Sequence, residues 1–324
     1  MANTLLKVEN LCQYYAVSKG ALGKKAYVKA VDGVSFELKE GETLGIVGES
    51  GCGKSTLCKT LTKLVEPTSG KIEFDGVDIT HLSNKEMRPI RQNIQMIFQD
   101  PYASLNPRMS VSSIVSEPLK IYGRESSDKE EARRQVVELL KMVGLDDYHA
   151  DRYPHEFSGG QRQRIGIARA IALRPKLIVA DEPVSALDVS IQSQVLNLLS
   201  DLRKELGLTY IFIAHDLSVV EHISDRVGVM YLGNFVEVAD KYSLYQNPLH
   251  PYTKALLSAV PVPDPTVKKD RIILEGTIPN PMDAPKGCKF CTRCPDCMAI
   301  CKEIPPERTD VDENHYVYCH KYGK

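Results

Sequence analysis

The sequence predicts an α/β protein built on a doubly wound, largely parallel sheet. Three observations carry this prediction: short apolar strands recur along the chain, amphipathic helices separate them, and a glycine-rich loop joins one strand to the next helix. A length of 324 residues suggests about two domains. With 43% hydrophobic and 26% charged residues, the composition is globular and argues against intrinsic disorder.

The first 85 residues combine strands and turns around one loop and one helix. We expect strands at residues 34–38 and 42–47, the second running directly into the glycine-rich segment 48–56. The helix that follows is predicted to end at Pro67. Its apolar positions at helical spacing are Leu57, Leu61, Leu64 and Val65.

The middle of the chain begins with a polar, mainly helical region from about residue 101 to 156. Strand-like runs return at residues 177–180, 208–214 and 227–231, and a long amphipathic helix separates the first two. The apolar stripe of that helix is Ile191, Val195, Leu198, Leu199, Leu202 and Leu206.

The composition changes after about Val260. Nine of the 19 prolines lie between Pro261 and Pro306, and six of the nine cysteines lie in the last 37 residues. We therefore divide the chain into a domain at residues 1–260, with a helical subdomain at about 101–174, and a C-terminal extension at residues 261–324. The extension has too little apolar sequence for a large core, which favours a bound metal as its support.

Charge and hydropathy narrow the location and the partners. Basic and acidic residues number 41 and 42, so the formal net charge is −1 and no nucleic-acid partner is expected. No run of about 18 apolar residues occurs, so we do not expect the chain itself to span a bilayer. The first residues do not have the pattern of a secretory signal, which predicts a cytoplasmic location.

The segment after the strand at residues 42–47 has the spacing of a phosphate loop: Gly, four residues, then Gly-Lys-Ser. Glycines allow a tight backbone path with amide hydrogens pointing inward, and the N-terminus of the next helix adds a favourable dipole. Lys54 is predicted to reach the terminal phosphates, and the Ser55 hydroxyl to bind magnesium. The loop residues are Gly48, Glu49, Ser50, Gly51, Cys52, Gly53, Lys54, Ser55 and Thr56.

A second element complements the loop: the apolar strand at residues 177–180 ends in Asp181 and Glu182. We expect Asp181 to hold the hydration shell of the magnesium ion and Glu182 to polarise an attacking water. A nucleotide hydrolase needs both a phosphate cradle and a metal-holding carboxylate.

A third element is a second glycine-containing helix start, with Ser158, Gly159, Gly160 and Gln161 directly before a helix predicted to end at Leu173. One nucleotide has no evident need for two such sites from one chain. We therefore expect a dimer in which this segment of each chain caps the nucleotide held by the other.

With these motifs in place, the chain resembles the nucleotide-binding subunits of ABC transporters. Six segments occur in that family's order and spacing: the phosphate loop, the segment around Gln99, residues 158–161, Asp181 with Glu182, residues 185–188, and residues 214–216. Phe157 replaces the leucine usual before the serine. The resemblance implies an ABC-type P-loop NTPase fold, with a RecA-like core, an antiparallel β subdomain and a helical subdomain.

The resemblance also implies roles for single residues. Gln99 senses magnesium and the attacking water, Glu182 is the general base and His215 contacts the terminal phosphate. Asp188 touches the partner subunit, and Lys54, Ser55 and Thr56 bind phosphates and magnesium. Tyr15 stacks on adenine, although Tyr14 could take that role, and an aromatic residue of a hairpin core is the alternative for Tyr15.

Residues 99–108, residues 247–252 and the start of the cysteine tail resemble the ATPases of dipeptide and oligopeptide importers. This resemblance implies ATP hydrolysis that powers peptide import. The implied partners are a homologous ATPase subunit in a heterodimer or homodimer, two membrane permease subunits and, indirectly, an extracytoplasmic peptide-binding protein. The implied location is the cytoplasmic face of the membrane, as a peripheral subunit.

Other functions stay open at this stage. Related importers carry nickel, glutathione or sugars. A soluble ABC protein acting on nucleic acid or ribosomes is a further alternative, but the chain has neither a second motif set nor a long coiled-coil insertion. A redox role for the tail lacks a flavin or nicotinamide motif that would receive electrons.

Two ligand sets compete in the cysteine tail. The spacing of Cys291, Cys294, Cys297 and Cys301 is that of a bacterial ferredoxin, with Lys302 in place of the expected proline. The resemblance to peptide-importer ATPases instead implies a 4Fe–4S cluster on Cys288, Cys294, Cys301 and Cys319, which we favour. Zinc is the alternative metal, because four thiolates also suit a tetrahedral site. The three earlier cysteines, Cys12, Cys52 and Cys58, are expected to be ordinary small residues.

Overall fold

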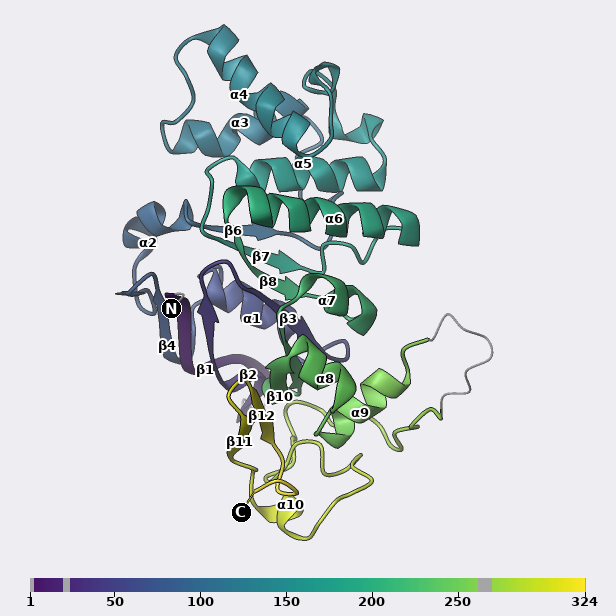
Figure 1. Cartoon of the computed structure of the whole chain (residues 1–324). Helices are drawn as coiled ribbons and strands as arrows, with labels where there is room; N and C mark the ends of the chain where they lie inside the picture. Colours follow the sequence, from purple (N-terminus) through teal and green to yellow (C-terminus); the bar gives the residue numbers. More distant parts are fainter. Residues whose placement is uncertain (1–2, 20–23, 262–269, 324) are drawn as a thin grey trace. The chain divides into compact units, whose positions relative to one another are not determined.

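The computed structural model describes residues 3–19, 24–261 and 270–323, which form two compact units (Figure 1). Unit 1 contains Leu82–Ile213 together with Lys39–Glu42 and Asn3. Unit 2 contains Thr4–Leu38, Thr43–His81 and the C-terminal part from Ala214. Each unit has its own strands and helices, and we describe them in turn.

Unit 1 is built around three parallel strands, β6 (Ile94–Ile97), β7 (Leu177–Asp181) and β8 (Thr209–Ile213). Leu177 of the central strand β7 pairs with Ile94 on one side and Thr209 on the other. Strands β7 and β8 are buried along their whole length, which explains why both read as continuous apolar runs. Their carboxyl ends place Asp181 at the edge of this sheet.

The helices of unit 1 include a group between β6 and β7: α3 (Val111–Ile121), α4 (Lys129–Met142) and α5 (Gly159–Ile171). These three pack on one another (Figure 1). Short 3-10 turns, η1 (Asp147–His149) and η2 (Pro154–Glu156), lie between α4 and α5. The long helix α6 (Val189–Leu206) joins β7 to β8, as the apolar stripe predicts.

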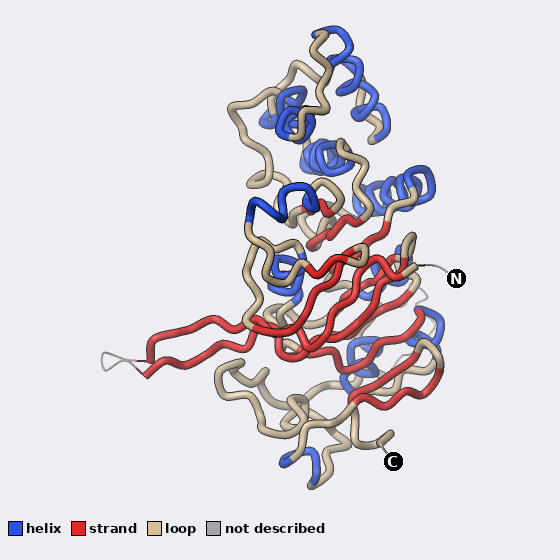
Figure 2. Tube along the Cα trace, turned by 90° about the vertical axis from the view of Figure 1, so that its left-hand side faces the viewer, coloured by secondary structure: helices blue, strands red, loops and turns tan. Residues whose placement is uncertain are grey.

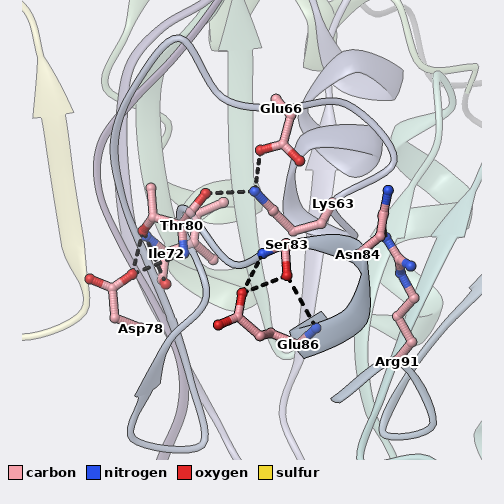
Figure 3. Close-up of polar contacts among 9 residues, drawn as sticks. All are labelled: Lys63, Glu66, Ile72, Asp78, Thr80, Ser83, Asn84, Glu86 and Arg91. Carbon is pink, nitrogen blue, oxygen red and sulfur yellow. Dashed lines mark hydrogen bonds and ion pairs between the residues drawn. The ribbon is translucent and has the colours of Figure 1, made fainter. Parts of the chain in front are cut away.

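Helix α2 (Asn84–Arg91) opens unit 1 with a complete capping box. Ser83 Oγ accepts a bond from the Glu86 amide, while the Glu86 carboxylate accepts a bond of 2.8 Å from the Ser83 amide (Figure 3). This reciprocal pair satisfies donors that a helix start otherwise leaves without partners.

Unit 2 contains two sheets. In the first, the strand order is β2 (Lys24–Lys39), β1 (Thr4–Lys19), β4 (Ser69–Phe74), β5 (Val77–Asp78). Strands β1 and β2 are long and run side by side (Figure 2). The pairs β1–β4 and β4–β5 are antiparallel, which agrees with the predicted antiparallel subdomain.

In the second sheet, the strands that belong to unit 2 have the order β11 (Arg308–Asp312), β12 (His315–Tyr318), β10 (Asn234–Asp240), β9 (Arg226–Tyr231), β3 (Thr43–Val47). Strand β3 is parallel to β9, and the other neighbours are antiparallel. The last two strands come from the cysteine-rich tail, so backbone pairing as well as side chains holds the tail to this unit.

The helices of unit 2 are α1 (Lys54–Leu61), α7 (Leu217–Ile223), α8 (Lys241–Gln246), α9 (Pro251–Ser258) and α10 (Ile300–Glu303). Helix α1 ends earlier than predicted, because Lys63 adopts a left-handed φ of 54° and the Leu64 amide returns to the Lys59 carbonyl. The Lys63 ammonium is buried beside Glu66 and donates to the Thr80 carbonyl at 2.6 Å (Figure 3). An amphipathic pattern alone did not indicate this stop.

The predicted α/β class and the strands expected at residues 42–47, 177–180, 208–214 and 227–231 are confirmed. In the ranges that the structure describes, none of the helices has the length and apolar character needed to cross a membrane. The domain boundary near Val260 stays a prediction, and residues 262–269, at the start of the predicted extension, lie outside the described residues.

Candidate nucleotide-binding site

The phosphate loop connects β3 to α1 in unit 2, as predicted. Its backbone passes so close to neighbouring chain that only glycine fits at two positions. A Cβ on Gly48 would lie 2.2 Å from the Met230 carbonyl oxygen, and one on Gly53 would lie 2.0 Å from the Ala30 carbonyl oxygen. Gly53 also has a left-handed φ of 108°. The glycine spacing is therefore required by packing as well as by the turn.

Lys54 folds back into this loop. Its side chain is 4% exposed, and Nζ donates to the carbonyl oxygens of Gly48 at 2.8 Å and Glu49 at 3.2 Å. Gly53 is the N-cap of α1 and supplies no side-chain acceptor for the first amides of the helix. A buried ammonium and a helix start without a side-chain cap together form a cradle for an anion such as a triphosphate.

The other loop residues surround this cradle. Ser55 and Thr56 lie in the first turn of α1 and are partly exposed, while Ser50 and Gly51 are exposed at the tip of the loop. Cys52 is buried, and burial raises the pKa of its thiol. A neutral, buried thiol agrees with the expectation that Cys52 is an ordinary small residue.

Glu49 is held from two sides by residues for which the sequence predicts no role at the nucleotide. Its amide donates to the hydroxyl oxygen of Tyr252 at 2.9 Å. Its carboxylate accepts two bonds from the Arg293 guanidinium, at 2.7 and 3.1 Å. Both partners are more than 200 positions away in the sequence, so no local spacing could identify them.

The two candidates for adenine stacking differ in their surroundings. The Tyr14 hydroxyl donates to the Asp32 carboxylate, and Lys29 Nζ lies 5.4 Å from the centre of the Tyr14 ring. The Tyr15 side chain is instead 39% exposed. This difference is compatible with Tyr15 as the stacking residue, which stays a prediction.

Unit 1 carries the acidic pair. Asp181 is the buried last residue of β7, and Glu182 follows it with a left-handed φ of 47°. Two bonds hold this backbone: the Glu182 amide donates to the Ile213 carbonyl at 3.1 Å, and the Glu182 carbonyl accepts from Ser185 Oγ at 3.0 Å. A left-handed backbone at a non-glycine residue costs about 1 kcal/mol and is common at functional positions.

Gln99 lies next to Glu182, as the proposed chemistry needs. Its side-chain Nε2 donates to Glu182 Oε2 at 2.8 Å. The predicted metal and water sensor therefore contacts the predicted general base directly.

The Ser158 segment begins helix α5 with a capping box. Ser158 Oγ accepts a bond of 3.4 Å from the Gln161 amide, and the Gln161 side chain accepts one of 3.1 Å from the Ser158 amide. A Cβ on Gly160 would lie 2.4 Å from the Ile191 side chain, so this glycine allows α5 to approach α6 closely. Ser158 itself is exposed.

Two more predicted residues lie at helix starts. Asp188 is the N-cap of α6, where Oδ1 accepts from the Ile191 amide at 3.0 Å and from Ser190 Oγ at 2.7 Å. These bonds lower the pKa of Asp188. His215 is exposed and directly precedes Asp216, the N-cap of α7 in unit 2.

The tail cysteines lie close to one another in unit 2. Burial raises the pKa of Cys288 to about 12, and the nearby sulfurs of Cys301 and Cys319 act in the same direction. Burial raises the pKa of Cys294 to about 11, with Cys319 again among its neighbours. Within residues 3–19, 24–261 and 270–323, however, no group of three or more His, Cys, Asp or Glu side chains is arranged to hold a metal ion. The thiols are near one another but do not form a finished ligand set.

A phosphate loop closed by its own lysine at the head of a helix defines a P-loop nucleotide-binding protein. The chain matches the ABC transporter family over residues 31–185 and the C-terminal region of the oligopeptide/dipeptide transporter family over residues 236–301. It is 57% identical over 324 residues to the oligopeptide transport ATP-binding protein AppF of Bacillus subtilis (strain 168), covering 99% of this chain and 98% of AppF.

Two further proteins extend these similarities. OppF of Salmonella typhimurium (strain LT2), an oligopeptide transport ATP-binding protein, is 57% identical over 281 residues, covering 86% of this chain and 84% of OppF. The dimeric post-hydrolysis structure of the ATP-binding cassette MJ0796 bound to ADP and Pi matches with a TM-score of 0.66 and 32% identity, covering 73% of this chain and 99% of that one. The chain therefore belongs to the oligopeptide transport ATP-binding proteins of the ABC transporter family.

These findings confirm the predicted family and the ABC-type fold. They also identify a signal for the two partners of Glu49, because Tyr252 and Arg293 both lie in the stretch that matches the peptide-transporter C-terminal region. The roles of the individual site residues stay predictions.

Proposed function

We propose that this chain is the ATP-hydrolysing subunit of an ABC importer for oligopeptides or dipeptides. The observation that carries the proposal is the similarity to AppF, which spans nearly the whole of both chains and includes the C-terminal region. The geometry around Lys54 and the Gln99–Glu182 contact give this similarity a chemical basis.

In this proposal the loop binds the triphosphate of ATP. Lys54 turns from the Gly48 carbonyl toward the terminal phosphates, and the amides of residues 51–56 donate to phosphate oxygens. Ser55, Gln99 and Asp181 hold magnesium, directly or through its water, and Thr56 adds a phosphate contact. Bound magnesium neutralises negative charge on the phosphates.

Glu182 is the general base in this proposal. Its carboxylate accepts a proton from water as the water oxygen attacks the terminal phosphorus, and the bond from that phosphorus to the ADP oxygen breaks. Gln99 orients the carboxylate through the bond of 2.8 Å. His215 contacts the terminal phosphate, and Tyr15 stacks on adenine.

We further propose that two such subunits close around ATP. Residues 158–161 of one subunit cap the nucleotide of the other, and Asp188 contacts the partner. The capping box supports this role, because α5 is stable at its start without a ligand and leaves Ser158 exposed. The partner is a homologous ATPase subunit or a second copy of this chain.

The wider assembly follows from the same proposal. Two permease subunits would cross the membrane, an extracytoplasmic protein would deliver the peptide, and this chain would bind the permease at the cytoplasmic face. Residues 1–260, with a helical subdomain at about 101–174, would form the nucleotide-binding domain, and residues 261–324 the extension.

For the extension, we propose a 4Fe–4S cluster bound by Cys288, Cys294, Cys301 and Cys319, with zinc as the alternative metal. The mutual proximity of these thiols supports it, and metal binding would have to draw them into a ligand set.

Replacing the proposed base tests the function. We expect Glu182→Gln to keep ATP affinity within about twofold and to lower phosphate release about 10²–10⁴-fold, because general-base catalysis is lost while the binding loop is intact. ATP-driven uptake of labelled di- and oligopeptides into vesicles containing the whole complex should fall with it. Glu131→Gln, at an exposed carboxylate of α4, is the control and should change neither rate. Unchanged phosphate release in Glu182→Gln would remove the assigned base.

Metal analysis tests the cluster and separates the two ligand sets. Protein purified without oxygen should contain iron and acid-labile sulfide, and Cys319→Ser should lose both, because Cys319 belongs only to the proposed set. Cys297→Ser belongs only to the ferredoxin-like set and should retain them. The reverse pattern would favour the ferredoxin-like set. Zinc without sulfide would favour the alternative zinc site.

A further inference from the structure

The segment 289–293, between Cys288 and Cys294, packs against the strands and helix that surround the phosphate loop. Phe290 is buried, and its ring centre lies 5.2 Å from that of Tyr231 and 5.4 Å from that of Tyr252. Lys289 donates to the Asp32 carboxylate at 2.8 Å and to the Leu232 carbonyl at 2.9 Å. Residues 289–293 are therefore anchored at their start, and this fixes where Arg293 points.

Arg293 forms a forked ion pair with the phosphate loop. Its two terminal nitrogens lie 2.7 and 3.1 Å from the two carboxylate oxygens of Glu49. The side chain of Arg293 is 8% exposed and that of Glu49 is 26% exposed, so solvent screens this pair less than a surface pair.

Glu49 also connects Arg293 to the residue that binds phosphate. The Glu49 carbonyl accepts a bond of 3.2 Å from Lys54 Nζ, and the Glu49 amide donates to Tyr252. The carboxylate, the amide and the carbonyl of Glu49 thus each form a hydrogen bond. Its charge is the unfavourable feature, because a carboxylate beside the loop repels a triphosphate.

We propose that Arg293 is a positioning residue of the nucleotide site: by cancelling the charge of Glu49, it keeps this side of the phosphate loop in its binding shape. The proposal rests on the proposed function, since it assumes that ATP binds in this loop. Residues 289–293 then have a role in ATP affinity, and this role does not depend on which metal the tail cysteines bind.

A charge-swap cycle tests the proposal with a fluorescent ATP analogue titrated into the full-length chain. Arg293→Gln should raise the Kd about tenfold, because a partly buried carboxylate loses its partner next to the bound phosphates. The same substitution is then made in a Glu49→Gln background. There the double variant should bind like the Glu49→Gln single variant to within about twofold, since no carboxylate is left for Arg293 to neutralise.

Control variants separate charge from folding. Arg133→Ala removes an arginine with the same forked geometry toward Asp151, at 2.8 and 2.7 Å, but on an exposed surface of unit 1, and it should leave the Kd unchanged. Arg293→Lys retains the charge without the fork and should bind more tightly than Arg293→Gln. It also serves as the test variant if Arg293→Gln does not fold.

The possible results are distinct. Two results would overturn the proposal. One is a Kd that does not respond to Arg293→Gln. The other is a Kd that rises and is not rescued by Glu49→Gln, because a merely structural contact would not depend on the charge of Glu49. If wild type itself fails to bind the analogue, the proposed ATP site is wrong as well.

Discussion

The starts of helices α1 and α5 look alike in sequence but differ in structure. Both have glycine at or directly before the first helical residue, with small hydroxyl residues nearby. At α1 the N-cap is Gly53, which has no side chain to cap the helix, and the buried Lys54 reaches back over the loop. At α5 the N-cap is Ser158, which forms a capping box with Gln161 and is exposed.

The difference shows that glycine at a helix start does not by itself define a ligand site. The start of α1 combines a helix dipole, an N-cap without a side chain and an ammonium, which together favour the binding of an anion. The start of α5 already satisfies part of its donors internally. It can therefore present Ser158 to another molecule without depending on a ligand for its own stability.

Removing one side chain from each helix start tests this comparison most strongly. We expect Lys54→Ala to weaken ATP binding by the isolated chain about 100-fold, because a charge-assisted contact to phosphate is lost. Ser158→Ala should leave that affinity unchanged within about twofold and cost about 1 kcal/mol of folding stability through loss of the cap. Equilibrium titration with ATP and urea unfolding measure the two effects.

The matched variant Ser158→Asn separates capping from ligand contact, because asparagine caps helices about as well as serine. It should restore the stability lost in Ser158→Ala. If Ser158→Ala weakened ATP binding by the single chain as strongly as Lys54→Ala, the two helix starts would not have the different roles inferred here.

The sequence predicted best what lies close together along the chain. The phosphate loop is one continuous segment, and the capped start at Ser158 is another, so their local geometry follows from spacing and residue type. The carboxyl end of β7 likewise placed Asp181 at the edge of its sheet. In each case the interacting groups are neighbours in the sequence.

Contacts between distant residues could not be predicted in this way. Arg293 reaches Glu49 across 244 positions, and Tyr252 reaches it across 203. Strand β12 escaped prediction because its pairing partner β10 lies far away in the sequence, with Val238 opposite Tyr316 and Glu237 opposite Val317. Strand β11 pairs in turn with β12. The left-handed backbone of Glu182 was also hidden, since its support comes from Ile213 and Ser185. Tertiary contacts decide each of these features, and a single sequence carries little record of them.

Helix α9 extends the account of the phosphate loop, because a residue of α9 bonds to that loop. Tyr252 of α9 holds the Glu49 amide, and the N-cap of α9 is His250. His250 is buried, and its Nδ1 accepts a bond of 3.1 Å from the Tyr252 amide, so that nitrogen carries no proton. The His250 amide donates to the buried Glu237 carboxylate at 2.9 Å, and the Phe290 ring packs against the imidazole.

This buried cap predicts a stability that depends on pH. Burial lowers the pKa of His250 to about 4, against the opposing effect of Glu237, whereas the pKa in the unfolded chain is near 6.5. The unfolded chain therefore binds more protons between these two values, so stability present at pH 7 is lost as the pH falls from about 6.5 toward 4. At pH 5 the loss through this one group is on the order of 2 kcal/mol.

His250→Asn sharpens this prediction, because asparagine retains an N-cap acceptor but does not titrate. We expect its urea-unfolding midpoint to fall less between pH 7 and pH 5 than that of wild type. His155→Asn, at an exposed histidine of unit 1, should instead follow the wild-type pH dependence. If His250→Asn and wild type lost stability equally, the imidazole would not be the buried base that supports α9. The attachment of Tyr252 to the phosphate loop would then not depend on the protonation state of His250.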